Sequence, residues 1–380
     1  MKKQTEIWVI YSLLFAFIAV FTFQDVYGQT ILKPGESVNM MCTSCPSAPT
    51  RLPDVKVVDP SGNGDYTTVK DAAGNAQPGL TILVKNGTYN SKINITTSGT
   101  ETSRIILKPY PGHSPVLDFT GSPDSRPNIE ITADYITVKG FEIRNGWDGI
   151  KIEGDNNTIR DNYIHDNDYN GILIVNAGEN IIEHNKIAHN GTAPGKCVMK
   201  GSSSPRHCHG IYISQYKCGG GSNGNVIRSN HILNHGGSGI QWNGDGCTNR
   251  FLNTVVEKNR FENNSWRLAL YYGVDNSSIK HNNFISHSRP NTNNTSYPFI
   301  SIWGSENNTI ESNTFYATMS DTSGIQVYYT ESENNIVNKN MWKLNYSWWV
   351  WAGTWRDDWL AYQQATGWDK DGEVTVAVSQ

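Results

Sequence analysis

Five residues that can bind an anion and move protons lie within a thirteen-residue stretch of the chain. They are Lys200, Arg206, His207, His209 and Tyr212. Lys and Arg side chains can stabilise the negative charge that develops in a reaction, and His, Lys and Tyr side chains can serve as general base or general acid. The stretch therefore predicts a catalytic site for an anionic substrate. A loop that carries solvated basic residues is the alternative.

The cluster interrupts a repeated pattern. An apolar-x-x-Asn-x-apolar unit recurs seven times, with asparagines at Asn162, Asn185, Asn230, Asn259, Asn282, Asn313 and Asn340, and Phe141 holds the same place in an eighth copy. Most steps are 23 to 31 residues, a period that indicates a solenoid. Short alternating strands without a helix signal favour an all-β solenoid. We expect the asparagines to stack along its axis as an amide ladder.

Insertions break this repeat in one region. The step from Asn185 to Asn230 is 45 residues because of insertions at about 191–208 and 215–224, and a third insertion covers 243–253. A solenoid needs none of these segments for stability, so loops grafted on one rim are the natural place for function. His209 and Tyr212 follow the first insertion directly.

The first strand of each coil is expected to present one outward row beside these insertions. In coil order the row is Lys151, Leu173, Tyr212, Gln241, Tyr271, Ser301 and Gln326, on an alignment that sets Leu270 and Tyr272 level with Ile150 and Ile152. A second row holds Gly149, Gly171, Gly210, Gly239 and Gly324, with Ala269. Glycines either let a polymer approach the backbone closely or shape a tight turn. We expect substrate along this row, bound by Gln241, Tyr271, Arg267 and Asp245.

The other outward positions have mixed charges and predict a solvated face. They are Arg160, Glu183, Arg228, Glu257 and Lys280, with Tyr163, Lys186, His231 and Arg260.

The termini predict export and capping. Lys2 and Lys3 precede an apolar run, Ile7 to Phe23, so we assign residues 1–28 to a signal peptide, with an uncleaved anchor as the alternative. Residues 29–54 are expected to be a leader, and residues 55–380 one solenoid domain. A short helix at 68–76, followed by a strand at 81–85, is expected to cap its start. A helix from Arg356 to Thr366 is expected to close its end, where seven of the twelve tryptophans follow residue 340. They favour core and cap packing over a sugar-stacking patch.

Cysteine usage and net charge narrow the compartment and the partners. Six cysteines fit an oxidising compartment, so we expect a secreted protein, extracellular or periplasmic. Disulfides are expected to hold the insertions, with candidates Cys197, Cys208, Cys218 and Cys247, whose pairing the sequence leaves open. The net charge of −4 favours neither nucleic acid nor an anionic membrane surface as a partner. We expect a monomer that has no membrane contact after signal cleavage.

Three segments carry a resemblance to a known superfamily. GLTILVKNGTY, SRIILKPYPGHSPVLDF and ADYITVKGFEIRN resemble the opening of right-handed parallel β-helix proteins of the pectate-lyase-like superfamily. They are similar in particular to secreted polysaccharide lyases of the chondroitinase B and alginate lyase type. Later repeats such as NGILIVN and HGIYIS resemble the generic repeat that lyases, hydrolases and uronate epimerases share. The resemblance covers about residues 55–375 and implies the fold.

The activity is less defined than the fold, because this superfamily hosts several chemistries. The chain lacks an extended lyase segment around a paired Lys and Arg, the DPH motif of mannuronan epimerases and the Asp motifs of polygalacturonases. A polyuronate lyase must neutralise the sugar carboxylate, remove the C5 proton and protonate the departing O4. A C5-epimerase shares the first two steps. The cluster at 200–212 contains the residue types for this chemistry, so an acidic polysaccharide is the expected partner.

Three alternatives stay open. A glycoside hydrolase needs two facing carboxylates, with Asp148, Asp168 and Asp245 as candidates. A non-catalytic glycan-binding or surface protein needs none. Metal binding through His207 and His209, as in copper-delivery β-helix proteins, lacks a dense His/Met/Cys cluster. We predict no metal site and no certain cofactor, with calcium as the one candidate.

Overall fold

The computed structural model describes residues 54–121, 127–192, 208–215, 222–244, 251–264, 266–271, 273–287, 297–318, 322–328, 332, 334–344, 349–351, 354–356, 363–364 and 367–376. All of them belong to the compact unit Leu52–Gln380. The predicted signal peptide and all but the last residue of the leader lie outside this part of the chain. Within it, no helix has the length and apolar character to span a membrane.

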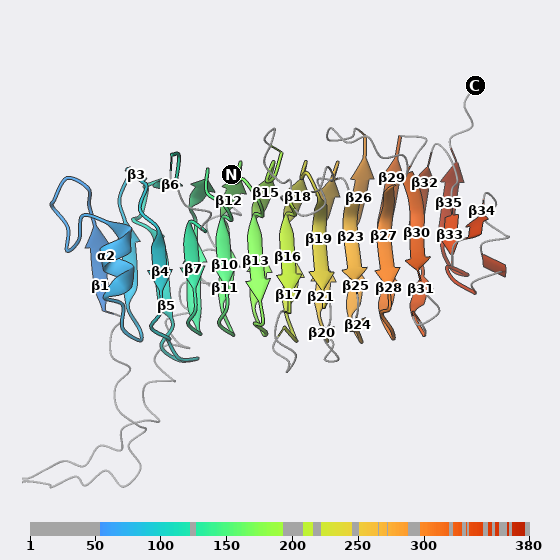
Figure 1. Ribbon diagram of the computed structural model, residues 1–380, viewed down its shortest axis with the longest axis horizontal. Coiled ribbons are helices and arrows are strands. Elements are labelled where there is room, and N and C mark those ends of the chain that lie inside the picture. The colour runs from blue at the N-terminus through green and yellow to red at the C-terminus, as the bar shows by residue number, and fades with distance from the viewer. Residues whose placement is uncertain are drawn as a thin grey trace, which may run out of the picture. The chain divides into compact units, whose positions relative to one another are not determined.

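Successive turns of the chain add strands to three 11-stranded sheets, and hydrogen-bonded neighbours are one coil apart (Figure 1). Sheet A contains β1 (Val55–Val58), β2 (Thr81–Val84), β5 (Ile105–Pro109), β8 (Ile136–Lys139), β11 (Thr158–Arg160), β14 (Ile181–Glu183), β17 (Val226–Arg228), β21 (Val255–Glu257), β25 (Ser278–Lys280), β28 (Thr309–Glu311) and β31 (Ile336–Asn338).

Sheet B contains β3 (Thr88–Tyr89), β6 (Val116–Asp118), β9 (Glu142–Arg144), β12 (Tyr163–His165), β15 (Lys186–Ala188), β18 (His231–Leu233), β22 (Arg260–Glu262), β26 (Asn283–Ser286), β29 (Thr314–Ala317), β32 (Met341–Leu344) and β35 (Glu373–Val376).

Sheet C contains β4 (Ile93–Ile95), β7 (Ile129–Ile131), β10 (Ile150–Ile152), β13 (Ile172–Val175), β16 (Ile211–Ser214), β19 (Ser238–Asn243), β23 (Trp266–Tyr271), β27 (Tyr297–Trp303), β30 (Thr322–Tyr328), β33 (Trp349–Trp351) and β34 (Thr354–Arg356). A separate pair joins β20 (Phe251–Leu252) to β24 (Val274–Asp275). Pairing within the three sheets is parallel except between β33 and β34, so the predicted all-β solenoid is confirmed as a parallel β-helix.

Apolar side chains of all three sheets fill the interior. In β10, Ile150 and Ile152 are fully buried while Lys151 between them points outward, which is the alternation expected of a strand with one buried face. Towards the C-terminus aromatic rings stack coil on coil, from Phe284 on Phe315 to Phe315 on Trp342. Trp342 is therefore a core residue, as the capping interpretation of the late tryptophans expects.

The predicted asparagine ladder is confirmed. At the corner between sheets A and B, each asparagine of the repeat donates its backbone N–H and its side-chain amide to Oδ1 of the next one, at 2.9 to 3.1 Å. Phe141 donates its backbone N–H to Asn162 at one end, and Asp369 accepts both bonds from Asn340 at the other. Because these groups are buried, each rung satisfies polar atoms that water cannot reach.

The N-terminal cap also agrees with the sequence. Helix α2 (Val69–Gly74) begins after Thr68, whose hydroxyl oxygen accepts the backbone N–H of Asp71 as an N-cap. The C-terminal helix was predicted to begin at Arg356, which instead ends strand β34. Residues 363–364 are helical, as predicted, and the rest of the stretch, 357–362 and 365–366, lies outside the described residues.

One register assignment is wrong. Leu268 and Leu270, rather than Leu270 and Tyr272, continue the buried row of Ile240 and Trp242. The error has a simple cause: Leu268, Leu270 and Tyr272 all obey the same two-residue alternation, so a shift of two keeps the pattern. Ala269 therefore stands level with Gln241, and Tyr271 with Asn243.

The residues that were predicted to form one solvated face lie on two different sheets. Arg160 and its register partners lie in sheet A, whereas Tyr163 and its partners lie in sheet B, with the asparagine corner between them.

Candidate functional site

Three of the predicted site residues come together at the outer side of sheet C. Tyr212 of β16 and Gln241 of β19 are Cα partners in neighbouring strands. His209, just before β16, has its ring centroid 5.1 Å from that of Tyr212. All three are buried, His209 completely and Tyr212 with 7% of its surface exposed. Tyr212 and Gln241 thus belong to the predicted outward row, but they are buried rather than open to solvent.

His209 is a rung of a second, shorter ladder. Asn170 donates to Oδ1 of Asp148, the backbone N–H of His209 donates to Oδ1 of Asn170, and the backbone N–H of Ser238 donates to Nδ1 of His209 at 2.9 Å. A nitrogen that accepts an N–H carries no proton, so the neutral ring holds its proton on Nε2. His209 can thus donate from Nε2 but cannot accept a proton at Nδ1 while this bond persists.

Polar side chains of the next strand, β19, lie beside Tyr212. The Asn243 side-chain amide donates to the Tyr212 hydroxyl oxygen at 3.0 Å, and the Ser238 hydroxyl donates to Gln241 Oε1 at 3.2 Å. On the other side, Tyr212 packs against Leu173 and Val175. The Tyr212 hydroxyl thus accepts a hydrogen bond from Asn243 and has a proton of its own to donate.

Asp148, a candidate carboxylate for hydrolysis, lies inside this ladder. Burial raises its pKa to about 6, against the opposing effect of the bonds from Asn170. Its Oδ1 is occupied by those two bonds. Asp168 is half-buried, and Asp245 lies outside the described residues. The described part of the chain therefore does not present Asp148 as one of two facing catalytic carboxylates.

Charges on the N-terminal part of the same face compensate one another. Lys151 forms ion pairs with Glu130 at 3.1 Å and with Glu153 at 2.9 Å, and Lys92 pairs with Glu130. Two cations and two anions thus share this part of sheet C, which leaves no excess charge among them.

The row of glycines faces the core. A Cβ on Gly149 would lie 2.5 Å from a methyl carbon of Ile164 and 2.6 Å from the backbone oxygen of Gly171, and one on Gly171 would meet Ile187 and Gly210 in the same way. Glycine is therefore required at these positions because a side chain would clash with the core and with the backbone of the next coil. Their interpretation as a smooth surface for a polymer is wrong.

Several predicted site residues lie outside the described part of the chain. These are Lys200, Arg206, His207, Asp245, Cys197, Cys218 and Cys247. The backbones of Arg267 and Tyr271 are described in β23, without their side chains. Cys208 is disulfide-bonded, and its pairing with one of the other three candidates stays a prediction.

The sequence places Asn170 and Ser238 at the strand-entry position of His209 in other coils, but it gave them no role in the site. It missed Asn243, which holds the register position of Tyr271 and could have been found by a correct alignment of β23.

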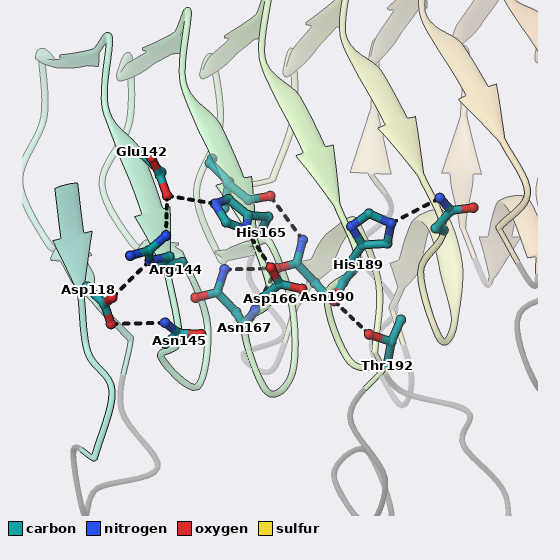
Figure 2. A network of polar contacts seen from close by, with 12 residues as sticks. Asp118, Glu142, Arg144, Asn145, His165, Asp166, Asn167, His189, Asn190 and Thr192 are labelled. Atoms are coloured by element: carbon teal, nitrogen blue, oxygen red, sulfur yellow. Dashed lines mark hydrogen bonds and ion pairs between the residues drawn. The ribbon is translucent and has the colours of Figure 1, made fainter. Parts of the chain in front are cut away.

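A separate polar network lies on sheet B. Figure 2 shows His165 between Asp166 and Glu142, with Nδ1 2.6 Å and Nε2 3.3 Å from their carboxylate oxygens. Arg144 donates to Glu142 and to Asp118. Its members satisfy one another across three coils, which indicates a role in stabilising this sheet. Among the described residues, no group of three or more His, Cys, Asp or Glu could hold a metal ion.

Comparison with known proteins agrees with this architecture. Residues 60–204 match the family described as Pel9A-like, right-handed β-helix region. The chain is a right-handed parallel β-helix protein. No curated protein matches its sequence.

Solved structures share the fold at low sequence identity. XylC in complex with xylose is 14% identical with a TM-score of 0.54, over 78% of this chain and 69% of XylC. ORF18 of Geobacillus virus E2 is 16% identical with a TM-score of 0.52, over 74% of this chain and 57% of ORF18. Alginate lyase from Paenibacillus sp. str. FPU-7 is 18% identical with a TM-score of 0.49, over 70% of this chain and 92% of the lyase. At these identities the likeness concerns the fold alone.

Proposed function

We propose that this protein is a secreted carbohydrate-active enzyme that acts on an acidic polysaccharide as a uronate lyase or C5-epimerase. The observation that carries the proposal is the grouping of His209, Tyr212 and Gln241 on one side of sheet C, next to the end of the insertion that carries Lys200, Arg206 and His207. The Pel9A-like family match supports it, since Pel9A is a pectate lyase.

The chemistry assigns a task to each kind of residue. Lys200 and Arg206 neutralise the uronate carboxylate, which stabilises the charge that develops when the C5 proton leaves. Tyr212, as its phenolate, accepts that proton. In elimination the bond from C4 to O4 then breaks, a C4–C5 double bond forms and O4 takes a proton from a general acid. In epimerisation C5 takes a proton on its opposite face instead.

The burial of Asp148 favours this proposal over a glycoside hydrolase. Hydrolysis needs one carboxylic acid and one carboxylate on either side of the scissile bond. Asp148 instead accepts two hydrogen bonds inside the ladder.

Incubation with alginate, polygalacturonate and chondroitin sulfate tests the proposal. A lyase yields an unsaturated product that absorbs in the ultraviolet, and an epimerase changes the uronate signals in NMR spectra without chain cleavage. New reducing ends without that absorbance would show a hydrolase instead. Binding without any product would leave a glycan-binding protein.

A further inference from the structure

Asn243, to which the sequence assigns no role, lies at the end of strand β19 beside the candidate site. Its side-chain amide donates a hydrogen bond to the Tyr212 hydroxyl oxygen at 3.0 Å. The register partner of Tyr212 in β19 is Gln241, two residues before Asn243. Tyr212 therefore leans diagonally across the strand pair. Trp242 between the two β19 residues is buried in the core, so Gln241 and Asn243 both belong to the outer side of the sheet.

The side chain of Tyr212 is held at its ring and at its oxygen. The ring packs against Leu173 and Val175 of β13 on one side, and its centroid is 5.1 Å from that of His209. These contacts come from the preceding strand and from the entry to β16 itself. The hydrogen bond from Asn243 comes from the following strand and fixes the hydroxyl oxygen. The position of this oxygen therefore depends on Asn243.

Tyr212 also contacts the two points at which insertions join the coils. His209 directly follows the insertion at 191–208, and Asn243 is the first residue of the insertion at 243–253. Tyr212 contacts the ring of the first residue and the amide of the second. A bond between Tyr212 and Asn243 thus connects the candidate site to the start of the second of these insertions.

We propose that Asn243 is a positioning residue for Tyr212, whose hydroxyl oxygen it holds at the place where the proton of the substrate is transferred. This role rests on the proposed function, in which the Tyr212 oxygen receives the C5 proton of a uronate. Asn243 acts through Tyr212 and does not itself touch the substrate.

The hydrogen bond has two effects on proton transfer. An N–H that donates to one side of the Tyr212 oxygen directs the exchange of a proton to its other side. The bond also restricts the movement of the oxygen relative to the reacting carbon. A displacement of about 1 Å between reacting groups can lower a rate ~100-fold, so a tyrosine without this bond should transfer the proton more slowly.

Two other roles for Asn243 compete with this one. The amide could bind the substrate directly, in which case its loss would raise KM. The bond could also serve only the stability of the sheet, in which case its loss would change neither kinetic constant. A positioning residue instead affects kcat, and it does so only while the Tyr212 hydroxyl is present.

Steady-state kinetics on alginate, polygalacturonate or chondroitin sulfate, whichever the wild-type protein turns over, separate these roles. Asn243→Ala should lower kcat about ten- to hundredfold and leave KM within about twofold. In a Tyr212→Phe background the same change should alter kcat by less than about twofold, since residues that act as a unit are not additive. Asn94→Ala is the matched control, because Asn94 is exposed on the same side of sheet C, in β4.

Thermal unfolding shows whether each variant is folded. Asn243→Leu, which keeps the approximate size of the side chain without its donor, repeats the test if Asn243→Ala does not fold. Unchanged kinetic constants, a rise in KM alone, or losses that multiply in the double variant would each overturn the positioning role while the proposed function stands. A wild-type protein that is inactive on all three polymers would contradict both.

Discussion

In two ladders of this molecule, side chains accept backbone N–H groups from the neighbouring coil, but the side chains differ. At the corner between sheets A and B, seven asparagines in consecutive coils repeat the same pair of hydrogen bonds. At the start of the sheet C strands, the rungs are Asp148, Asn170, His209 and Ser238. One rung of the varied ladder, His209, also has its ring beside that of Tyr212.

A third ladder shows that a histidine rung alone is not a sign of function. His235 accepts the backbone N–H of Asn190 at Nδ1 and donates from Nε2 to the backbone oxygen of Ile187. Burial lowers its pKa to about 3, so it remains neutral at any ordinary pH. Its neighbours in the ladder are asparagines, Asn190 and Asn264. His209 differs because its ring contacts Tyr212.

The largest expected effect concerns Tyr212. Tyr212→Phe removes only the hydroxyl, so turnover should fall at least ~100-fold, the usual scale for the loss of a general acid or base. Asn243 loses a hydrogen-bond partner, which should cost about 1 kcal/mol of unfolding free energy. Initial rates and chemical denaturation measure the two. Lys280→Ala, an ion-paired residue on sheet A, is the control. If Lys280→Ala lost activity while Tyr212→Phe kept full activity, the assignment of the site to sheet C would be wrong.

The varied ladder should also respond to pH through Asp148. Its folded pKa of about 6 lies above its usual value of 3.8, so the folded state binds the proton more tightly than the unfolded state does. Its effect is most favourable below about pH 4 and is lost as pH rises through 6, by about 2–3 kcal/mol. Asp148→Asn should therefore stabilise the protein at pH 8 and hardly at pH 4.

Denaturant unfolding of Asp148→Asn at both pH values checks this expectation. Part of the pH dependence should remain, because burial also raises the pKa of Asp369 to about 6. Asp161→Asn, at an exposed position, is the control. Equal changes in stability at pH 4 and pH 8 would show that Asp148 is not a buried titrating rung.

In the uniform ladder only stability should change. Asn259→Ala removes the acceptor for Asn230 and the side-chain donor to Asn282, and should cost roughly 1–3 kcal/mol of unfolding free energy. Asn90→Ala, at an exposed position, should cost almost nothing. Similar losses in both variants would mean that the ladder does not hold the coils.

The smallest expected effect concerns the cysteines, for which we expect no labelling. If Cys197, Cys208, Cys218 and Cys247 hold the insertions near the site as disulfides, thiol reagents should label none of them in unfolded, unreduced protein. Mass spectrometry counts the labels. Labelling of all four cysteines would contradict the prediction.

The sequence predicts the uniform ladder well and the varied one poorly, for a physical reason. Asn162 and its successors recur at a fixed distance from two buried apolar residues, so each coil repeats the same signal. At the start of sheet C the residue type changes in every coil, and hydrogen bonding decides what it does. Alternation could not fix the position of Tyr271, because a shift of two residues preserves it. The burial of His209 depends on which residues pack over the strand, and the local sequence pattern does not indicate this.

The most direct test of the varied ladder is the variant His209→Asn. Asn Oδ1 can take the place of Nδ1 as the acceptor for Ser238, as asparagines do on either side of His235, while the imidazole and its Nε2 proton are lost. The unfolding free energy should stay within about 1 kcal/mol of wild type, and turnover of the polysaccharide should fall at least ~100-fold. Full activity in this folded variant would mean that His209 only holds the backbone, as His235 does.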